Sequence, residues 1–149
     1  MLNYGISHLS KNFKISKLES NEDTGFLEIS VFSEDDKPIQ DAQVIIYLYS
    51  VRGIYRESAT ENVIGSYTTD ENGKVPPIEL PVIHVIGYPE ENTDEYHIRV
   101  DAAGYYSVIV INAEIYPNTT TSYNVILTPI IEGISPYVRF IIIPEKHWR

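Results

Sequence analysis

Cysteine is absent from the sequence, and tryptophan and methionine occur once each. Without cysteine the chain has no disulfide framework, no thiolate metal site and no cysteine nucleophile. Basic residues are also scarce, because 11 Lys and Arg stand against 21 Asp and Glu, for a formal charge of -10. Nucleic acids and anionic membranes are themselves negative, so the charge argues against both as partners.

Long hydrophobic runs are missing as well. The longest apolar run near the C-terminal end is Phe140 to Ile143, far below the roughly 20 residues of a membrane helix. Residues 1–20 lack a basic start followed by an apolar core, so they do not resemble a signal peptide. The sequence therefore predicts a soluble protein that is not exported by that route, with no membrane partner.

Familiar catalytic and metal-binding patterns are absent too. The four histidines, His8, His84, His97 and His147, show no short metal-ligand spacing, so we interpret each as solvated or hydrogen-bonded. There is no Gly-x-Ser-x-Gly motif and no Gly-rich phosphate loop. The acidic stretches "SEDDKP" and "PEENTDE" could bind a divalent cation weakly, but solvated turns explain them better. We expect no enzyme, no cofactor and no metal site.

What the sequence does contain is alternation typical of strands. In "GFLEISVF", Leu27, Ile29 and Val31 share one face while Glu28 and Ser30 take the other. The run "AQVIIYLYS" has apolar residues on both faces, which is typical of a central or covered strand. Residues 51–62 are charged and predict an exposed connection. About seven short strands, separated by turn signals, predict an all-β antiparallel Greek-key sandwich.

The segment "TDENGK" allows two interpretations. With Gly73 at the sixth place of a calcium loop, Asp70, Asn72 and Glu79 fall on ligand positions, but Thr68 stands where a carboxylate is expected. Pro76-Pro77 also opposes an exit helix. We favour a plain structural turn. The residues assigned to structural turns are Asp70, Asn72, Gly73 and Gly104.

The order of motifs resembles a known family. "GFLEISVFSEDDKPIQDAQVIIY", "TDENGKVPPIELP", "YHIRVDAAGYYS" and "PNTTTSYNVILTP" are similar to the carboxypeptidase regulatory-like, prealbumin-like (transthyretin-like) modules of clostridial-type bacteria. The resemblance covers about residues 25–129 and implies a prealbumin-like sandwich, in modules that are commonly accessory, adhesive or structural rather than catalytic.

Enzymes with related folds have signatures that this chain lacks. Hydroxyisourate hydrolases end in Tyr-Arg-Gly-Ser, whereas this sequence ends in "KHWR". Intradiol dioxygenases bind iron through two Tyr and two His with an Arg-x-x-His-x-His motif, which is not found here. Related pilin modules join a first-strand Lys to a last-strand Asn, but the segment Phe26 to Phe32 has no Lys to join to Asn124.

The two ends are rich in β-prone residues, so we divide the chain into an N-terminal arm (residues 1–20), a sandwich (21–130) and a C-terminal arm (131–149). We expect a non-catalytic structural protein whose arms pair with other copies, as a homo-oligomer or filament, or dock on a larger spore-associated or phage-like particle. The candidate assembly residues are Tyr4, Ile6, Phe13, Ile15, Val138, Phe140 and Ile142. The alternative is a module that binds peptidoglycan or another glycan, since Tyr47 and Tyr49 lie together and tyrosine rings stack on sugars or contact proteins.

Overall fold

The computed structural model describes residues 23–53, 58–83, 92–133 and 139–142. Every regular element in these ranges is a strand, and no helix among them is long and apolar enough to cross a membrane. The strands are β1 (Thr24–Ser33), β2 (Gln43–Arg52), β3 (Ser58–Thr68), β4 (Ile78–Pro81), β5 (Asn92–Asp101), β6 (Val108–Ala113), β7 (Thr120–Leu127) and β8 (Arg139–Ile142).

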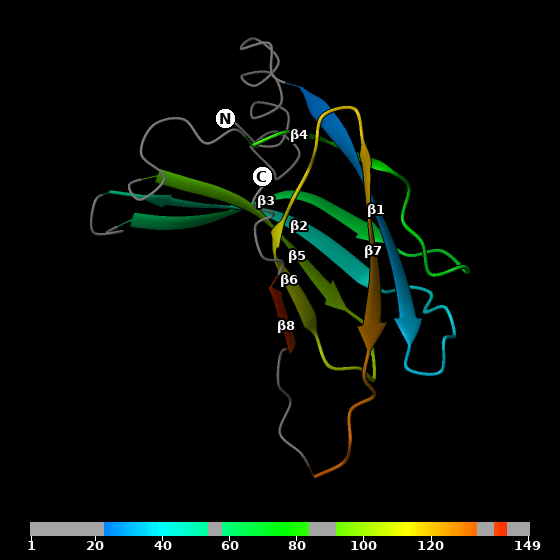
Figure 1. Cartoon of the computed structure of the whole chain (residues 1–149). Helices are drawn as coiled ribbons and strands as arrows, with labels where there is room; N and C mark the ends of the chain where they lie inside the picture. The colour runs from blue at the N-terminus through cyan, green and yellow to red at the C-terminus, as the bar shows by residue number, and fades with distance from the viewer. Residues whose placement is uncertain (1–22, 54–57, 84–91, 134–138, 143–149) are drawn as a thin grey trace, which may run out of the picture.

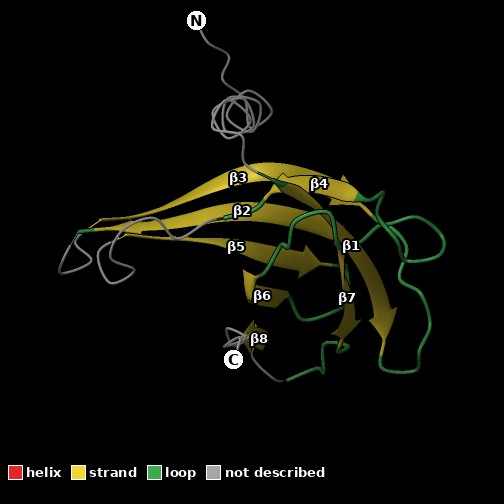
Figure 2. Cartoon of the chain, turned by 45° about the horizontal axis from the view of Figure 1, so that its top comes forward, coloured by secondary structure: helices red, strands yellow, loops and turns green. Residues whose placement is uncertain are grey.

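The strands form two layers. A small sheet has the order β4-β1-β7 and a large sheet the order β3-β2-β5-β6-β8. Figures 1 and 2 show β1 and β7 crossing one face of the large sheet. The predicted all-β sandwich is confirmed. It is mostly antiparallel, but β1 pairs with β7 and β6 pairs with β8 in parallel, which is possible because each partner returns after a long crossover.

The core lies between the two layers and follows the predicted alternation. Leu27, Ile29 and Val31 of β1 are 0–1% exposed, and they face fully buried residues of the large sheet. Because side chains alternate along a strand, the intervening residues of the large sheet point to its other face. This face is called the outer face below.

The large sheet extends beyond the small one. In both views β2, β3 and β5 run together past β1 and β7 (Figure 2). The expected connection over residues 51–62 is wrong at its two ends, because Val51 and Arg52 complete β2 and Ser58 begins β3. The register continues to the pair Arg52 and Ser58. Charged residues suggested a loop, but they are tolerated in strands that are not sandwiched between two layers.

The turn at Asp70 joins β3 to the segment before β4. The Gly73 amide donates to the Asp70 carbonyl oxygen at 2.9 Å, and Asp70 Oδ1 accepts the amides of Asn72 (2.8 Å) and Lys74 (2.9 Å). Gly73 has a φ of 73°, a conformation that glycine adopts readily. A Cβ there would also lie 2.4 Å from the Val31 carbonyl oxygen. Gly104, the other glycine assigned to a turn, has a φ of 84°.

Candidate functional site

Apolar and aromatic side chains gather on the outer face of the large sheet, where an antiparallel sheet usually carries polar residues. They are half-buried, and none belongs to the hydrophobic core. We call them the outer tyrosine face: Ile45, Tyr47 and Tyr49 of β2, His97 of β5, and Ile109 and Ile111 of β6.

Strand register brings these residues side by side. Tyr47 is paired with His97 of β5 on one side and with Val63 of β3 on the other. Ile109 is paired with Arg99 across the β5–β6 ladder. Directly paired residues share one face of a sheet. The register therefore places apolar residues of three central strands on one face, with Arg99 between Ile45 and Ile109.

His97 is held in place by two contacts. Its ring stacks on that of Tyr49, with centroids 4.8 Å apart and planes 18° from parallel. Its Nε2 lies 3.1 Å from Glu95 Oε2, and its side chain is only 12% exposed. Stacking and a polar contact together fix both rings, so the face presents a rigid surface.

A paired charge lies within the outer tyrosine face, because Arg99 of β5 is the register partner of both Ile45 of β2 and Ile109 of β6. Arg99 Nε donates to Asp101 Oδ2 at 2.7 Å, and this hydrogen bond raises the pKa of Arg99. The Ser107 hydroxyl donates to the other oxygen of Asp101. Asp101 thus accepts from two directions, which fixes the Arg99 side chain beside Ile109.

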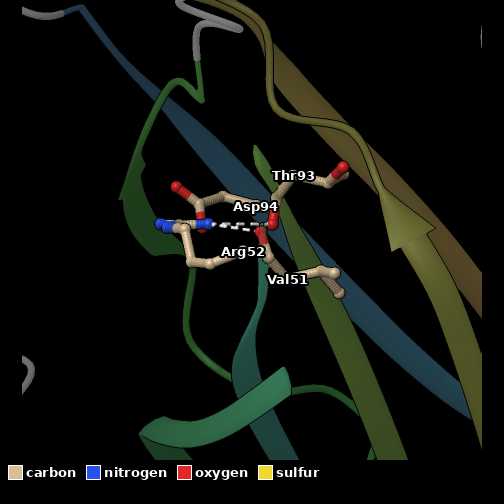
Figure 3. Close-up of polar contacts among 4 residues, drawn as sticks. All are labelled: Val51, Arg52, Thr93 and Asp94. Carbon is tan, nitrogen blue, oxygen red and sulfur yellow. Dashed lines mark hydrogen bonds and ion pairs between the residues drawn. The ribbon is translucent and has the colours of Figure 1, made fainter. Parts of the chain in front are cut away.

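A second polar cluster lies where the end of β2 meets the start of β5 in the large sheet (Figure 3). Arg52 Nη1 donates to the carbonyl oxygens of Val51 (2.9 Å) and Thr93 (3.2 Å), while Arg52 Nη2 lies 2.7 Å from Asp94 Oδ1. The cluster fastens the end of β2 to the start of β5. Arg52 is 48% exposed, so this ion pair contributes little stability.

Asp94 also lines a pocket of about 310 Å³ between the segment after β4, β5 and the end of β6. Glu114 and Tyr116 lie on its other side, and the Tyr116 hydroxyl donates to Glu114 Oε2. This bond raises the pKa of Tyr116 to about 12. Burial raises the pKa of Tyr123, which also interacts with Glu114. The pocket is acidic, but the described residues contain no group of three or more His, Asp or Glu that could hold a metal ion.

The calcium interpretation of "TDENGK" gains no support from the contacts of its residues. Asp70 Oδ1 is occupied by two backbone amides. Glu79 Oε1 accepts the Thr24 hydroxyl at 2.8 Å across the small sheet. Both carboxylates act as acceptors within the fold.

Two of the candidate assembly residues lie in the part of the chain that the structure describes. Phe140 and Ile142 lie in β8, where they are the register partners of Ile109 and Ile111 of β6 in the same chain. Tyr4, Ile6, Phe13, Ile15 and Val138 lie outside the described residues, as do His8, His84 and His147. The two arms and their boundaries stay predictions.

Comparison with known proteins shows the fold but no family. No family model matches the chain, and no curated protein matches its sequence. Among solved structures, 3-chlorocatechol 1,2-dioxygenase from Rhodococcus opacus 1CP is similar at 13% identity and a TM-score of 0.51, over 73% of this chain and 61% of that one. Catechol 1,2-dioxygenase from Acinetobacter sp. ADP1 has 16% identity and a TM-score of 0.50, over 83% and 59% of the two chains.

Hydroxyquinol 1,2-dioxygenase from Pseudomonas putida DLL-E4 gives 11% identity, a TM-score of 0.51, and coverage of 73% of this chain and 57% of that chain. This chain therefore spans about three fifths of each of these structures. At such identities the likeness shows a shared β-sandwich and transfers no activity.

These comparisons contradict the function expected from the sequence, an assembly protein with a glycan-binding module as the alternative. The three structures are dioxygenases, and none is an assembly or glycan-binding protein. A physical reason lies in β8, which pairs with β6 of its own chain. Backbone groups used in that ladder are no longer available to a neighbouring copy.

Sequence reasoning found the tyrosines but missed their neighbours. The sequence predicts that Tyr47 and Tyr49 lie together, and it predicts a solvated or hydrogen-bonded His97, which in the structure lies 3.1 Å from Glu95. The missing information was the register between β2 and β5, which brings His97 onto Tyr49. The pairing of Arg52 with Asp94 was missed because Arg52 had been assigned to a loop.

Proposed function

We propose that this chain is a non-catalytic protein-binding module, and that the outer tyrosine face is its contact surface. One observation carries the proposal: apolar and aromatic residues of three strands share the outer side of the large sheet, around the Arg99–Asp101 pair, with no second layer over them among the described residues. Apolar side chains that gather on one uncovered face of a sheet commonly mark an interaction site.

The composition of the patch suits a protein partner. Tyrosine offers a large contact area with little rotational freedom to lose, and it is enriched at protein interfaces. Ile109 and Ile111 add aliphatic surface next to the rings. Because Tyr49 and His97 are already stacked in the free chain, a partner does not have to order them.

Charges around the patch suggest the chemistry of the partner. Glu61 of β3 is exposed and Glu95 is half-buried, while Arg99 is neutralised by Asp101. The whole chain has a formal charge of -10. A partner with an apolar centre and a basic rim would complement this surface, and nucleic acids and anionic membranes would be repelled.

The absence of catalysis is part of the proposal. The polar groups around the outer tyrosine face pair with one another, His97 with Glu95 and Arg99 with Asp101, instead of converging on a cavity. We also propose that the chain is one of the carboxypeptidase regulatory-like, prealbumin-like modules of clostridial-type bacteria. The motif order over residues 25–129 supports this family assignment.

The test compares three versions of the full-length chain as affinity baits in a lysate of the source cells: wild type, Tyr47→Ser with Ile109→Ser, and Phe26→Ser. Phe26 is 41% exposed and lies on the small sheet, so it is a matched control for loss of an exposed aromatic ring. Circular dichroism first establishes that all three fold. A protein retained by wild type and control is then purified and titrated by calorimetry.

We expect the double variant to lose at least about tenfold in affinity for that protein, because two central residues are removed. Phe26→Ser should bind like wild type. Equal affinity of all three versions would refute the contact surface. Oxygen uptake with catechol or hydroxyquinol in the presence of added iron, at a rate proportional to the concentration of this chain, would refute the non-catalytic assignment.

A further inference from the structure

The sequence contains a single Asn-Gly pair, Asn72-Gly73, in the turn between β3 and β4. In such a pair the backbone nitrogen of glycine can attack Cγ of the asparagine side chain. A carbon–nitrogen bond forms, ammonia leaves, and a five-membered succinimide results. Water then opens the ring to give aspartate or isoaspartate. Glycine favours this reaction because it has no Cβ to hinder the approach.

In the folded chain this nitrogen is held in a hydrogen bond. The Gly73 amide donates to the Asp70 carbonyl oxygen at 2.9 Å. The amides on either side of it, those of Asn72 and Lys74, both donate to Asp70 Oδ1. Asp70 therefore holds three consecutive amides of the turn. The ring can close only after the Gly73 nitrogen has left its acceptor and turned toward the Asn72 side chain.

The turn is also fastened to the small sheet. The Gly73 carbonyl oxygen accepts the Val31 amide at 2.7 Å, and Gly73 is buried against β1. This bond holds the adjacent Gly73-Lys74 peptide group, so the turn can open widely only if it also detaches from β1. The Asn72-Gly73 pair is thus chemically labile, but hydrogen bonds to Asp70 and Val31 hold it in place.

We propose that Asn72 is a deamidation site that Asp70 keeps closed in the folded chain, so that the reaction proceeds only from a locally opened turn. The rate then equals the intrinsic rate of the Asn-Gly pair multiplied by the fraction of chains in which the turn is open. This inference is independent of the proposed protein-binding role, because the turn and the outer tyrosine face share no residue.

The isoaspartate product would not fit back into the turn. Isoaspartate adds one methylene to the main chain and replaces a neutral amide with a carboxylate beside Asp70 and Glu71. The Val31 amide and the Gly73 carbonyl oxygen would no longer be in register. Each reaction that ends in isoaspartate therefore converts a closed turn into one that stays open.

The experiment incubates the full-length wild type, Asp70→Ala, Asp70→Asn and Glu71→Ala at about pH 8 and about 37 °C, in buffer and in guanidinium chloride, so that the closed and open turns are compared. Peptide mapping by mass spectrometry then follows deamidation and isoaspartate at position 72. Glu71→Ala is the matched control, because it removes a carboxylate from the same turn while leaving the Asp70 acceptor intact. Asp70→Asn retains an acceptor oxygen at the same place.

In denaturant all four chains should react at similar rates. Folding should slow deamidation at least roughly tenfold in three of the chains: wild type, Asp70→Asn and Glu71→Ala. In buffer, Asp70→Ala should deamidate roughly tenfold faster than wild type. Equal rates for folded and denatured wild type would overturn the proposal. So would equal protection of folded Asp70→Ala and Glu71→Ala.

If Asp70→Ala fails to fold, native-state hydrogen exchange of the wild type gives a second test. The Gly73 amide should exchange slowly, and low denaturant should accelerate its exchange and the deamidation of Asn72 by the same factor. Rapid Gly73 exchange in a chain that deamidates slowly would overturn the proposal, because the turn would then be open without reacting.

Discussion

The two faces of the large sheet carry similar residues but differ in what covers them. On the inner face Val44 and Ile46 of β2 and Ile98 of β5 are 0% exposed beneath the small sheet. On the outer face Ile45, Tyr47 and Tyr49 alternate with them and are half-buried without belonging to the core.

This difference separates stability from function. Burial between the sheets removes apolar surface from water, so inner residues should dominate the free energy of unfolding. Outer residues gain only part of that stabilisation, yet they are equally apolar. Under the proposed function, their apolar character serves the contact with a protein partner.

The largest expected effect compares two adjacent isoleucines of β2. Ile46→Ala leaves a cavity beneath the small sheet and should lower the free energy of unfolding by about 2–5 kcal/mol. Ile45→Ala should cost below about 1 kcal/mol, because its side chain is only half-buried. Urea denaturation of both variants measures the difference. Equal losses would show that the outer face is as important to folding as the inner one.

A second comparison uses tyrosine on both faces. Tyr96 is 1% exposed and donates its hydroxyl proton to the Pro81 carbonyl oxygen at 2.7 Å, which links the large sheet to the small one. Tyr96→Phe leaves that acceptor unpaired and should cost about 1–3 kcal/mol. Tyr47→Phe should stay within about 0.5 kcal/mol of wild type. Thermal unfolding measures both variants, each of which loses one tyrosine hydroxyl. A larger loss of stability in Tyr47→Phe than in Tyr96→Phe would refute the expected difference between the two faces.

The buried residues of the strands can be predicted from the sequence, whereas the pairing of the strands cannot. Leu27, Ile29 and Val31 alternate with Glu28 and Ser30, and local periodicity suffices to identify such a strand. The turn at Asp70 was equally visible, because Asp and Gly have specific roles in turns. These features depend on residues within a few positions of one another.

Features that depend on distant pairing could not be predicted in the same way. The parallel ladders of β1 with β7 and β6 with β8 join segments far apart in the chain. The stack of Tyr49 on His97 depends on the register between β2 and β5. No local pattern specifies that register, since a strand pairs through backbone groups that every residue carries.

A smaller effect tests whether the outer tyrosine face is preorganised. The Tyr49–His97 stack should contribute about 0.5–1.5 kcal/mol beyond the area that the two rings bury. A double-mutant cycle of Tyr49→Leu and His97→Leu isolates this coupling from the separate effects of the two substitutions. A coupling energy near zero would mean that the rings are not held together in solution. The partner would then have to order them on binding.

The smallest expected effect lies at the rim of the sandwich, where Glu114 accepts the Tyr116 hydroxyl and raises the pKa of Tyr116 to about 12. The protonated phenol is favoured in the folded chain. Its stabilising contribution is therefore complete below the unfolded pKa of about 10 and is lost as the pH rises from there through 12. Because Tyr116 is only half-buried, solvent screening keeps that contribution small.

Glu114→Gln removes the negative charge and should lower the pKa of Tyr116 toward its ordinary value. Phenolate absorbance during an alkaline titration, with Tyr116→Phe subtracted to isolate this ring from the other tyrosines, measures the shift. Glu71→Gln, on the Asp70 turn, is the control for loss of a carboxylate elsewhere. An unchanged titration of Tyr116 in Glu114→Gln would show that the rim is not held by this bond. The pocket lined by Asp94 and Glu114 would then lose the bond that fixes the Tyr116 ring on its lining, whereas the stack of Tyr49 on His97 on the outer face would be unaffected.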